Sequence, residues 1–109
     1  MEYRAMTVII SDFVEAQLDK ICRYYDGIGH PNYGLKIREN IIRSAYSLTT
    51  FPKLGKIDED DLGEYPYRYL IEEIHRIYYR INSKNDTIIV VFLFDTRQDP
   101  DKLVEEFPE

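Results

Sequence analysis

The chain is poor in the residues from which metal centres, disulfides and phosphate-binding loops are built. Its 109 residues include a single cysteine, Cys22, only two histidines and no tryptophan. One cysteine cannot form an internal disulfide, and a lone thiol is typical of a reducing compartment. No cysteine and histidine cluster has the spacing of metal ligands, and no glycine pattern matches a phosphate loop. The sequence therefore predicts neither a metal site nor a cofactor.

Long apolar segments are also missing. The longest uninterrupted apolar run, from Ile88 to Phe94, is far shorter than a membrane-spanning helix. The first residues contain no apolar stretch of the length that a secretion signal needs before charge returns. A chain of this length forms one domain of ordinary size. We therefore expect residues 1–109 to form a single cytoplasmic domain with no membrane partner.

The net charge of −6 is unevenly distributed. Residues 58–64, DEDDLGE, carry five acids and no base, and the tail 99–109 carries five acids and one lysine. The remaining body is slightly basic, but it lacks the dense lysine and arginine field of proteins that depend on phosphate contacts. Five like charges in seven residues repel one another. We therefore expect the loop 58–64 to be exposed, mobile and without regular structure.

The first half of the chain predicts one strand followed by a helical hairpin. Residues 6–10, MTVII, are a short β-branched run typical of a strand. Ser11 or Asp12 can cap a helix over roughly residues 11 to 27. A second helix, with Asn32 as its cap, runs from 32 to 51 and ends at Pro52. Apolar residues recur at helical spacing and should face the core at Val14, Leu18, Ile21, Tyr25, Leu35, Ile41, Ile42, Ala45 and Leu48.

The second half changes from a helical period to a period of two. After a polar loop at 52–66, strand formers dominate in 67–71 and 76–81, and 87–94 is apolar on both faces, as in a covered central strand. The predicted fold is α+β: an N-terminal strand, a two-helix hairpin, three antiparallel strands in one sheet, and a short C-terminal helical tail. Together with the hairpin, one core should include Ile77, Tyr79, Val90 and Phe92.

Several arginines fall where the predicted sheet has an open face. Period two places Ile77 and Tyr79 towards the hairpin, and therefore Arg76, Tyr78 and Arg80 on the opposite face. Further candidates are Arg68 on the neighbouring strand, Arg97 and Asp95 at the end of the last strand, and His75, whose participation stays open. Such a face could hold a phosphodiester and stack a base. The alternative is a solvated outer face whose arginines pair with Glu72, Glu73 and Asp95.

Short motifs along nearly the whole chain carry a resemblance to a known family. They are the early strand and helix, Leu48-x-x-Phe51-Pro52-x-x-Gly55, Tyr67-Arg68-Tyr69-Leu70, His75-Arg76-Ile77-Tyr78-Tyr79 and the closing stretch from Phe94 to Pro100. In this order and spacing the chain resembles the RelE/ParE superfamily of toxins from type II toxin–antitoxin modules, also called plasmid stabilisation or addiction modules. The resemblance implies the same fold and an antitoxin, encoded beside the toxin, that neutralises its inhibition of growth.

The resemblance leaves the target open between DNA gyrase and the ribosome with its mRNA. In the ribosome-dependent branch, basic groups hold the messenger while a ribose hydroxyl attacks its own phosphodiester without a metal. The matching catalytic positions here are Arg68, Arg76 and Arg97, and the resemblance implies target or antitoxin binding for Tyr78, Arg80 and Asp95. The gyrase-inhibiting branch needs no nucleolytic residues.

Two departures from the nuclease pattern keep these alternatives open. Leu70 stands where that branch has a second basic residue, and Leu103 and Val104 stand where some members have a tyrosine or histidine. A third alternative is a family member that has lost its toxicity and acts only as a protein-interaction module. A homodimer and a toxin–antitoxin hetero-oligomer are both compatible with the sequence.

Overall fold

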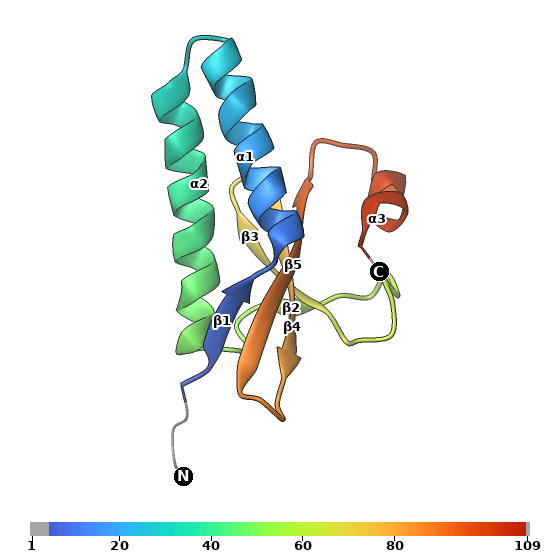
Figure 1. Cartoon of the computed structure of the whole chain (residues 1–109). Coiled ribbons are helices and arrows are strands. Elements are labelled where there is room, and N and C mark those ends of the chain that lie inside the picture. Colours follow the sequence, from blue (N-terminus) through green and yellow to red (C-terminus); the bar gives the residue numbers. More distant parts are fainter. Residues whose placement is uncertain (1–4, 109) are drawn as a thin grey trace.

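The computed structural model describes residues 5–108 and has a five-stranded sheet with a helical hairpin on one face (Figure 1). This confirms the predicted α+β class. In chain order the elements are β1 (Thr7–Ile10), α1 (Asp12–Gly27), α2 (Pro31–Tyr46), the 3₁₀ turn η1 (Ser47–Thr49), β2 (Lys56–Ile57), β3 (Arg68–Glu72), β4 (His75–Asn82), β5 (Thr87–Asp95) and α3 (Asp101–Glu106). Within the described part of the chain, no helix is both long and apolar enough to cross a membrane.

The strands lie in the order β1-β5-β4-β3-β2. β1 runs parallel to β5, whereas β3, β4 and β5 form the predicted antiparallel meander. β5 is therefore an inner strand, and it contributes buried residues to clusters on both faces of the sheet, in agreement with its apolar sequence. β2 could not be predicted from the sequence, because a strand of two residues is too short to show a hydrophobic period.

The helical hairpin begins and ends slightly differently from the prediction. Ser11, not Asp12, caps α1, because its hydroxyl accepts a hydrogen bond from the amide of Val14 at 3.2 Å. α2 begins at Pro31 with His30 as its N-cap, so the expected cap Asn32 is wrong. The expected helix to residue 51 ends as an α-helix at Tyr46 and continues only as η1.

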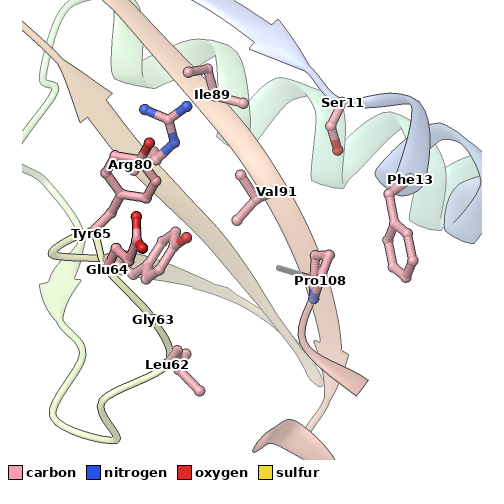
Figure 2. Close-up of a pocket in the computed structure, with 11 residues that line it drawn as sticks. Ser11, Phe13, Leu62, Gly63, Glu64, Tyr65, Arg80, Ile89, Val91 and Pro108 are labelled. Carbon is pink, nitrogen blue, oxygen red and sulfur yellow. The ribbon is translucent and has the colours of Figure 1, made fainter. Parts of the chain in front are cut away.

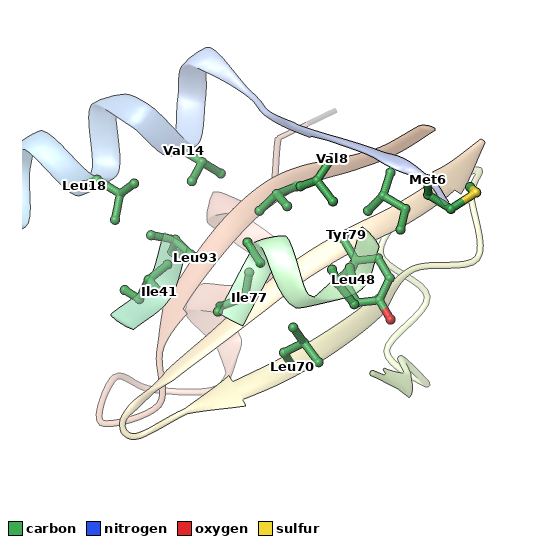
Figure 3. Packing of buried hydrophobic residues seen from close by; sticks show 13 residues of the cluster. Met6, Val8, Val14, Leu18, Ile41, Leu48, Leu70, Ile77, Tyr79 and Leu93 are labelled. Atoms are coloured by element: carbon green, nitrogen blue, oxygen red, sulfur yellow. The ribbon is translucent and has the colours of Figure 1, made fainter. Parts of the chain in front are cut away.

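One predicted core residue of the hairpin is wrong, because Leu35 is 56% exposed. It lies in the first turns of α2. The joined ends of α1 and α2 extend beyond the sheet (Figure 1). The buried face of the hairpin packs on one side of the sheet, as Figure 3 shows for its labelled residues. The buried members of this first core include Val14, Leu18, Ile41, Ala45, Leu48, Leu70, Ile77, Tyr79, Val90 and Leu93.

A bulge in β5 divides what the sequence predicted as a single core. Tyr78 pairs with Phe92 but Tyr79 pairs with Val90, so Val91 is an extra residue in β5. The extra residue reverses the alternation, and Val90 therefore faces the helices while Phe92 faces the opposite side. The expectation that both belong to one core is wrong.

The face of the sheet away from α1 and α2, here called the outer face, has a core of its own. Its buried members are Tyr67, Tyr78, Phe92, Phe94, Leu103 and Phe107. Two segments cover this face: the C-terminal segment with α3, and the connection between β2 and β3, whose Leu62 packs against the same cluster. The loop 58–64 in that connection has no helix or strand, as predicted.

Candidate functional site

Arg76 lies on the outer face of β4, as predicted, but its guanidinium is engaged by two tyrosines. Its Nη1 donates a hydrogen bond to the Tyr78 hydroxyl at 3.0 Å, and its Cζ lies 4.5 Å from the centre of the Tyr69 ring. The hydrogen bond to Tyr78 raises the pKa of Arg76, so the group keeps its charge. The cation is thus held in one orientation by aromatic partners.

Tyr78 was expected on an open face and is instead fully buried. Phe107 from the C-terminal segment packs edge-on against its ring, with the ring centres 5.6 Å apart. Burial raises the pKa of the Tyr78 hydroxyl, which keeps it protonated as a partner of Arg76. The Tyr78 ring is therefore not accessible to a target, and the prediction that Tyr78 binds one directly gains no support.

Arg68 does not join Arg76 on the outer face as expected. It is the cross-strand partner of Tyr79, and cross-strand partners point to the same side of a sheet, which here is the helix side. Its Nη1 donates to the carbonyl of Gly55 at 2.9 Å and to that of Lys53 at 3.4 Å. Arg68 and Arg76 nevertheless line one hollow of about 610 Å³ at the β2–β3 edge.

That hollow also contains the one carboxylate of the acidic loop that is half-buried, Asp58. One oxygen of Asp58 accepts a hydrogen bond from the Asp60 amide at 3.1 Å, while Oδ1 is buried without a hydrogen-bond partner in the described structure. Burial is the main cause that raises the pKa of Asp58, and the charge of Arg76 opposes it. Sequence analysis did not single out Asp58, because its burial depends on the path of the loop.

Arg80 lies on the outer face at a second hollow, of about 740 Å³, drawn in Figure 2. Its guanidinium carbon stands 4.1 Å from the centre of the Tyr65 ring. Glu64 lines the same hollow, and Ile89 and Val91 of β5 contribute an apolar wall. Arg80 therefore lies on the face that alternation predicted, and Tyr65 is a partner that sequence periodicity did not reveal.

Arg97 lies away from the other arginines and borders the helical hairpin. Its Nε and Nη2 donate to the two oxygens of Asp95 at 3.1 and 2.8 Å, which agrees with the expected pairing of an arginine with Asp95. This hydrogen bonding holds the pKa of Asp95 below its usual value. Arg97 lines a small hollow with Tyr25, Tyr33 and other residues of the helical side, so it does not meet Arg76.

His75 lines the hollow of Arg97 and faces the helices, as its position next to Arg76 predicts. It is 7% exposed, and burial lowers its pKa.

Of the three arginines proposed for catalysis, Arg68 and Arg76 line one hollow, whereas Arg97 lines another. Between residues 5 and 108, no cluster of three or more histidine, cysteine or acidic side chains could hold a metal ion.

The fold agrees with comparisons to known proteins. The sequence model of a family described as the ParE toxin of type II toxin–antitoxin systems, parDE, matches residues 8–100. A search of curated proteins finds no match. A chain in the crystal structure of the RelBE2 toxin–antitoxin complex from Mycobacterium tuberculosis has a TM-score of 0.63 and 16% identity, over 86% of this chain and 94% of that one. Because the family match spans most of the sequence, the chain belongs to the ParE toxin family of type II toxin–antitoxin systems.

Proposed function

We propose that this toxin inhibits growth by binding DNA gyrase and that an antitoxin protein neutralises it. The observation that carries the choice of target is the distribution of the arginines. Arg97 is held by Asp95 on the helical side, and Arg68 donates to the carbonyl of Gly55. Only Arg76 of the three reaches the outer face.

Cleavage of a phosphodiester requires donors that converge on the charge that develops in the transition state. The separation of Arg97 from Arg76 argues against such a convergence in this conformation. A toxin that acts by binding a protein needs no preorganised phosphate site, so the same distribution is compatible with it. The match to the ParE family points in the same direction.

The antitoxin is proposed from the outer face and from the fold relative. The hollow at Arg80 combines an apolar wall from Ile89 and Val91 with a cation whose described partner is a tyrosine ring. An antitoxin segment with apolar and acidic side chains would fit this surface. The relative of similar fold was solved as a toxin–antitoxin complex, which supports a partner of this kind.

The experiment is induced expression in bacteria, with and without the product of the neighbouring reading frame. We expect growth arrest, accumulation of double-strand DNA breaks before translation slows, and rescue by co-expression if the neighbour is the antitoxin. Early translation arrest with cut messengers and intact DNA would support the mRNA-cleaving alternative instead. Normal growth with a stable complex would support a non-toxic interaction module.

The substitution Arg97→Ala distinguishes gyrase binding from mRNA cleavage more directly. As a catalytic group, Arg97 would be required for mRNA cleavage, whereas a gyrase-binding toxin loses only an ion pair on an arginine side chain that is 65% exposed. We expect Arg97→Ala to remain toxic. Arg43→Ala is the matched control, since Arg43 also pairs on the surface, with Glu39. Loss of toxicity in the Arg97 variant alone, with the protein still folded, would contradict the proposal.

A further inference from the structure

The acidic loop 58–64 folds back over the outer face and approaches both of its arginines. Three of its acids, Asp58, Glu59 and Asp60, line the hollow that contains Arg76. A fourth, Glu64, lines the hollow that contains Arg80. The negative charges that make the sequence of this loop unusual are therefore distributed along the cationic strip formed by Arg76 and Arg80.

The loop is held in this position by contacts near both of its ends. At the start, the Asp58 amide donates to the carbonyl of Tyr67 at 2.9 Å. In the middle, Leu62 packs against the outer-face core. Just beyond its end, Tyr65 stacks on the guanidinium of Arg80 (Figure 2). These contacts fix the path of the loop, although it contains no regular secondary structure.

The acids of the loop lie near Arg76 and Arg80 but form no ion pair with them in the described structure. The ion pairs of the described residues involve Arg38, Arg43 and Arg97, and neither Arg76 nor Arg80 takes part in one. Glu59, Asp60 and Asp61 are exposed to solvent. Attraction between such charges is weak and screened by salt, so an external anion can compete with it.

We propose that the loop 58–64 is an intramolecular occupant of the Arg76–Arg80 strip and that an acidic peptide segment of a partner protein displaces it. The loop presents carboxylates along a peptide backbone, so a partner segment of the same chemistry is the natural competitor. The loop then lowers the affinity of this face for acidic segments and selects those that supply more carboxylates or better apolar contacts. The inference rests on the proposed antitoxin only for the identity of the displacing segment.

The test compares binding of a labelled synthetic peptide, about ten residues long with alternating glutamate and leucine, to purified full-length variants at low salt. The loop variant Glu59→Gln/Asp60→Asn/Asp61→Asn removes three exposed charges of the loop, two of which, Glu59 and Asp60, line the hollow of Arg76. The matched control Asp19→Asn/Asp26→Asn/Glu39→Gln removes three exposed charges on the helical hairpin. Both variants change the net charge equally, so a general attraction of anions affects them alike.

We expect the loop variant to bind the peptide about fivefold or more tightly than the unaltered chain, and the control to change by less than about twofold. Adding Arg80→Gln to the loop variant should abolish the gain. Equal gains in the two triple variants, or no gain in the loop variant, would overturn the proposal. A larger gain for a labelled oligonucleotide than for the peptide would overturn the choice of an acidic peptide. Because no gyrase is present, these outcomes are independent of the proposed target.

Discussion

The Tyr79 hydroxyl holds the segment between α2 and β2 in place, and Gly55 leaves the space that this contact needs. The Tyr79 hydroxyl donates to the carbonyl of Pro52 at 2.8 Å and accepts from the Gly55 amide at 2.9 Å. A Cβ added to Gly55 would stand 2.7 Å from the Tyr79 hydroxyl and 2.8 Å from the carbonyl oxygen of Tyr69. The spacing from Pro52 to Gly55 in the sequence is thus a packing requirement.

We predict that Gly55→Ala lowers the free energy of unfolding by about 1–3 kcal/mol, because the ring and the backbone of β3 must both move. Gly27→Ala is the control, since nothing lies within 4 Å of the added methyl group. It should be neutral or slightly stabilising. Urea denaturation of the two variants measures the difference, and equal stability of both would refute the packing argument.

Arg76 supports the structure as well as offering a charge. Arg76→Ala leaves the buried Tyr78 hydroxyl without its hydrogen-bond donor. We predict a loss of roughly 1–3 kcal/mol, the usual cost of an unsatisfied buried group. In a Tyr78→Phe background the same substitution should cost clearly less, because the hydroxyl is already absent. Additive losses in the double variant would rule out this coupling.

His75 should make stability depend on pH near neutrality. Burial lowers its pKa below the ordinary 6.5, so the unfolded chain takes up a proton as pH falls through this value while the folded chain resists it. The free energy of unfolding should therefore decrease from about pH 7 to about pH 5.5. His75→Gln should flatten this dependence, and His30→Gln, at the exposed turn before α2, should not. Urea denaturation at both pH values is the measurement, and an unchanged slope in the His75 variant would contradict the prediction.

Among the elements, α3 is short but its segment closes the outer face. Phe107, just after α3, packs on the rings of Tyr67, Tyr78 and Phe92 and is 8% exposed. We predict that Phe107→Ala destabilises the fold by about 3 kcal/mol, the lower end for a buried phenylalanine. Val104→Ala within α3, at a residue 61% exposed, should change stability by less than about 0.5 kcal/mol. Similar effects of both substitutions in thermal denaturation would show that the segment does not cover a core.

The elements with a long hydrophobic period were predictable from sequence, and the irregular ones were not. The hairpin and the meander of β3, β4 and β5 follow from helical and alternating patterns. The bulge at Val91 is invisible to a strict period of two, and it moved Phe92 to the second core. The burial of Tyr78 depends on a C-terminal segment distant in sequence, which no local pattern contains.

At the scale of the whole molecule, the same limits apply to the candidate site. Alternation correctly placed Arg76 and Arg80 on one face and His75 on the other. It could not reveal that the acidic loop would fold over that face, because loop paths depend on tertiary contacts such as Tyr65 on Arg80. The possible pairing with Asp95 was visible in the sequence, but the position of Arg97 at the end of a strand did not reveal that it would lie beside the helices.

The proposed target is tested most directly with purified components. The toxin is incubated with DNA gyrase and supercoiled plasmid, and the reaction is stopped with detergent and protease. Binding that poisons gyrase predicts linear DNA that increases with toxin concentration and disappears when the antitoxin is added first. The account is contradicted if the plasmid stays supercoiled while the same preparation cuts messenger RNA in a translation extract that contains ribosomes.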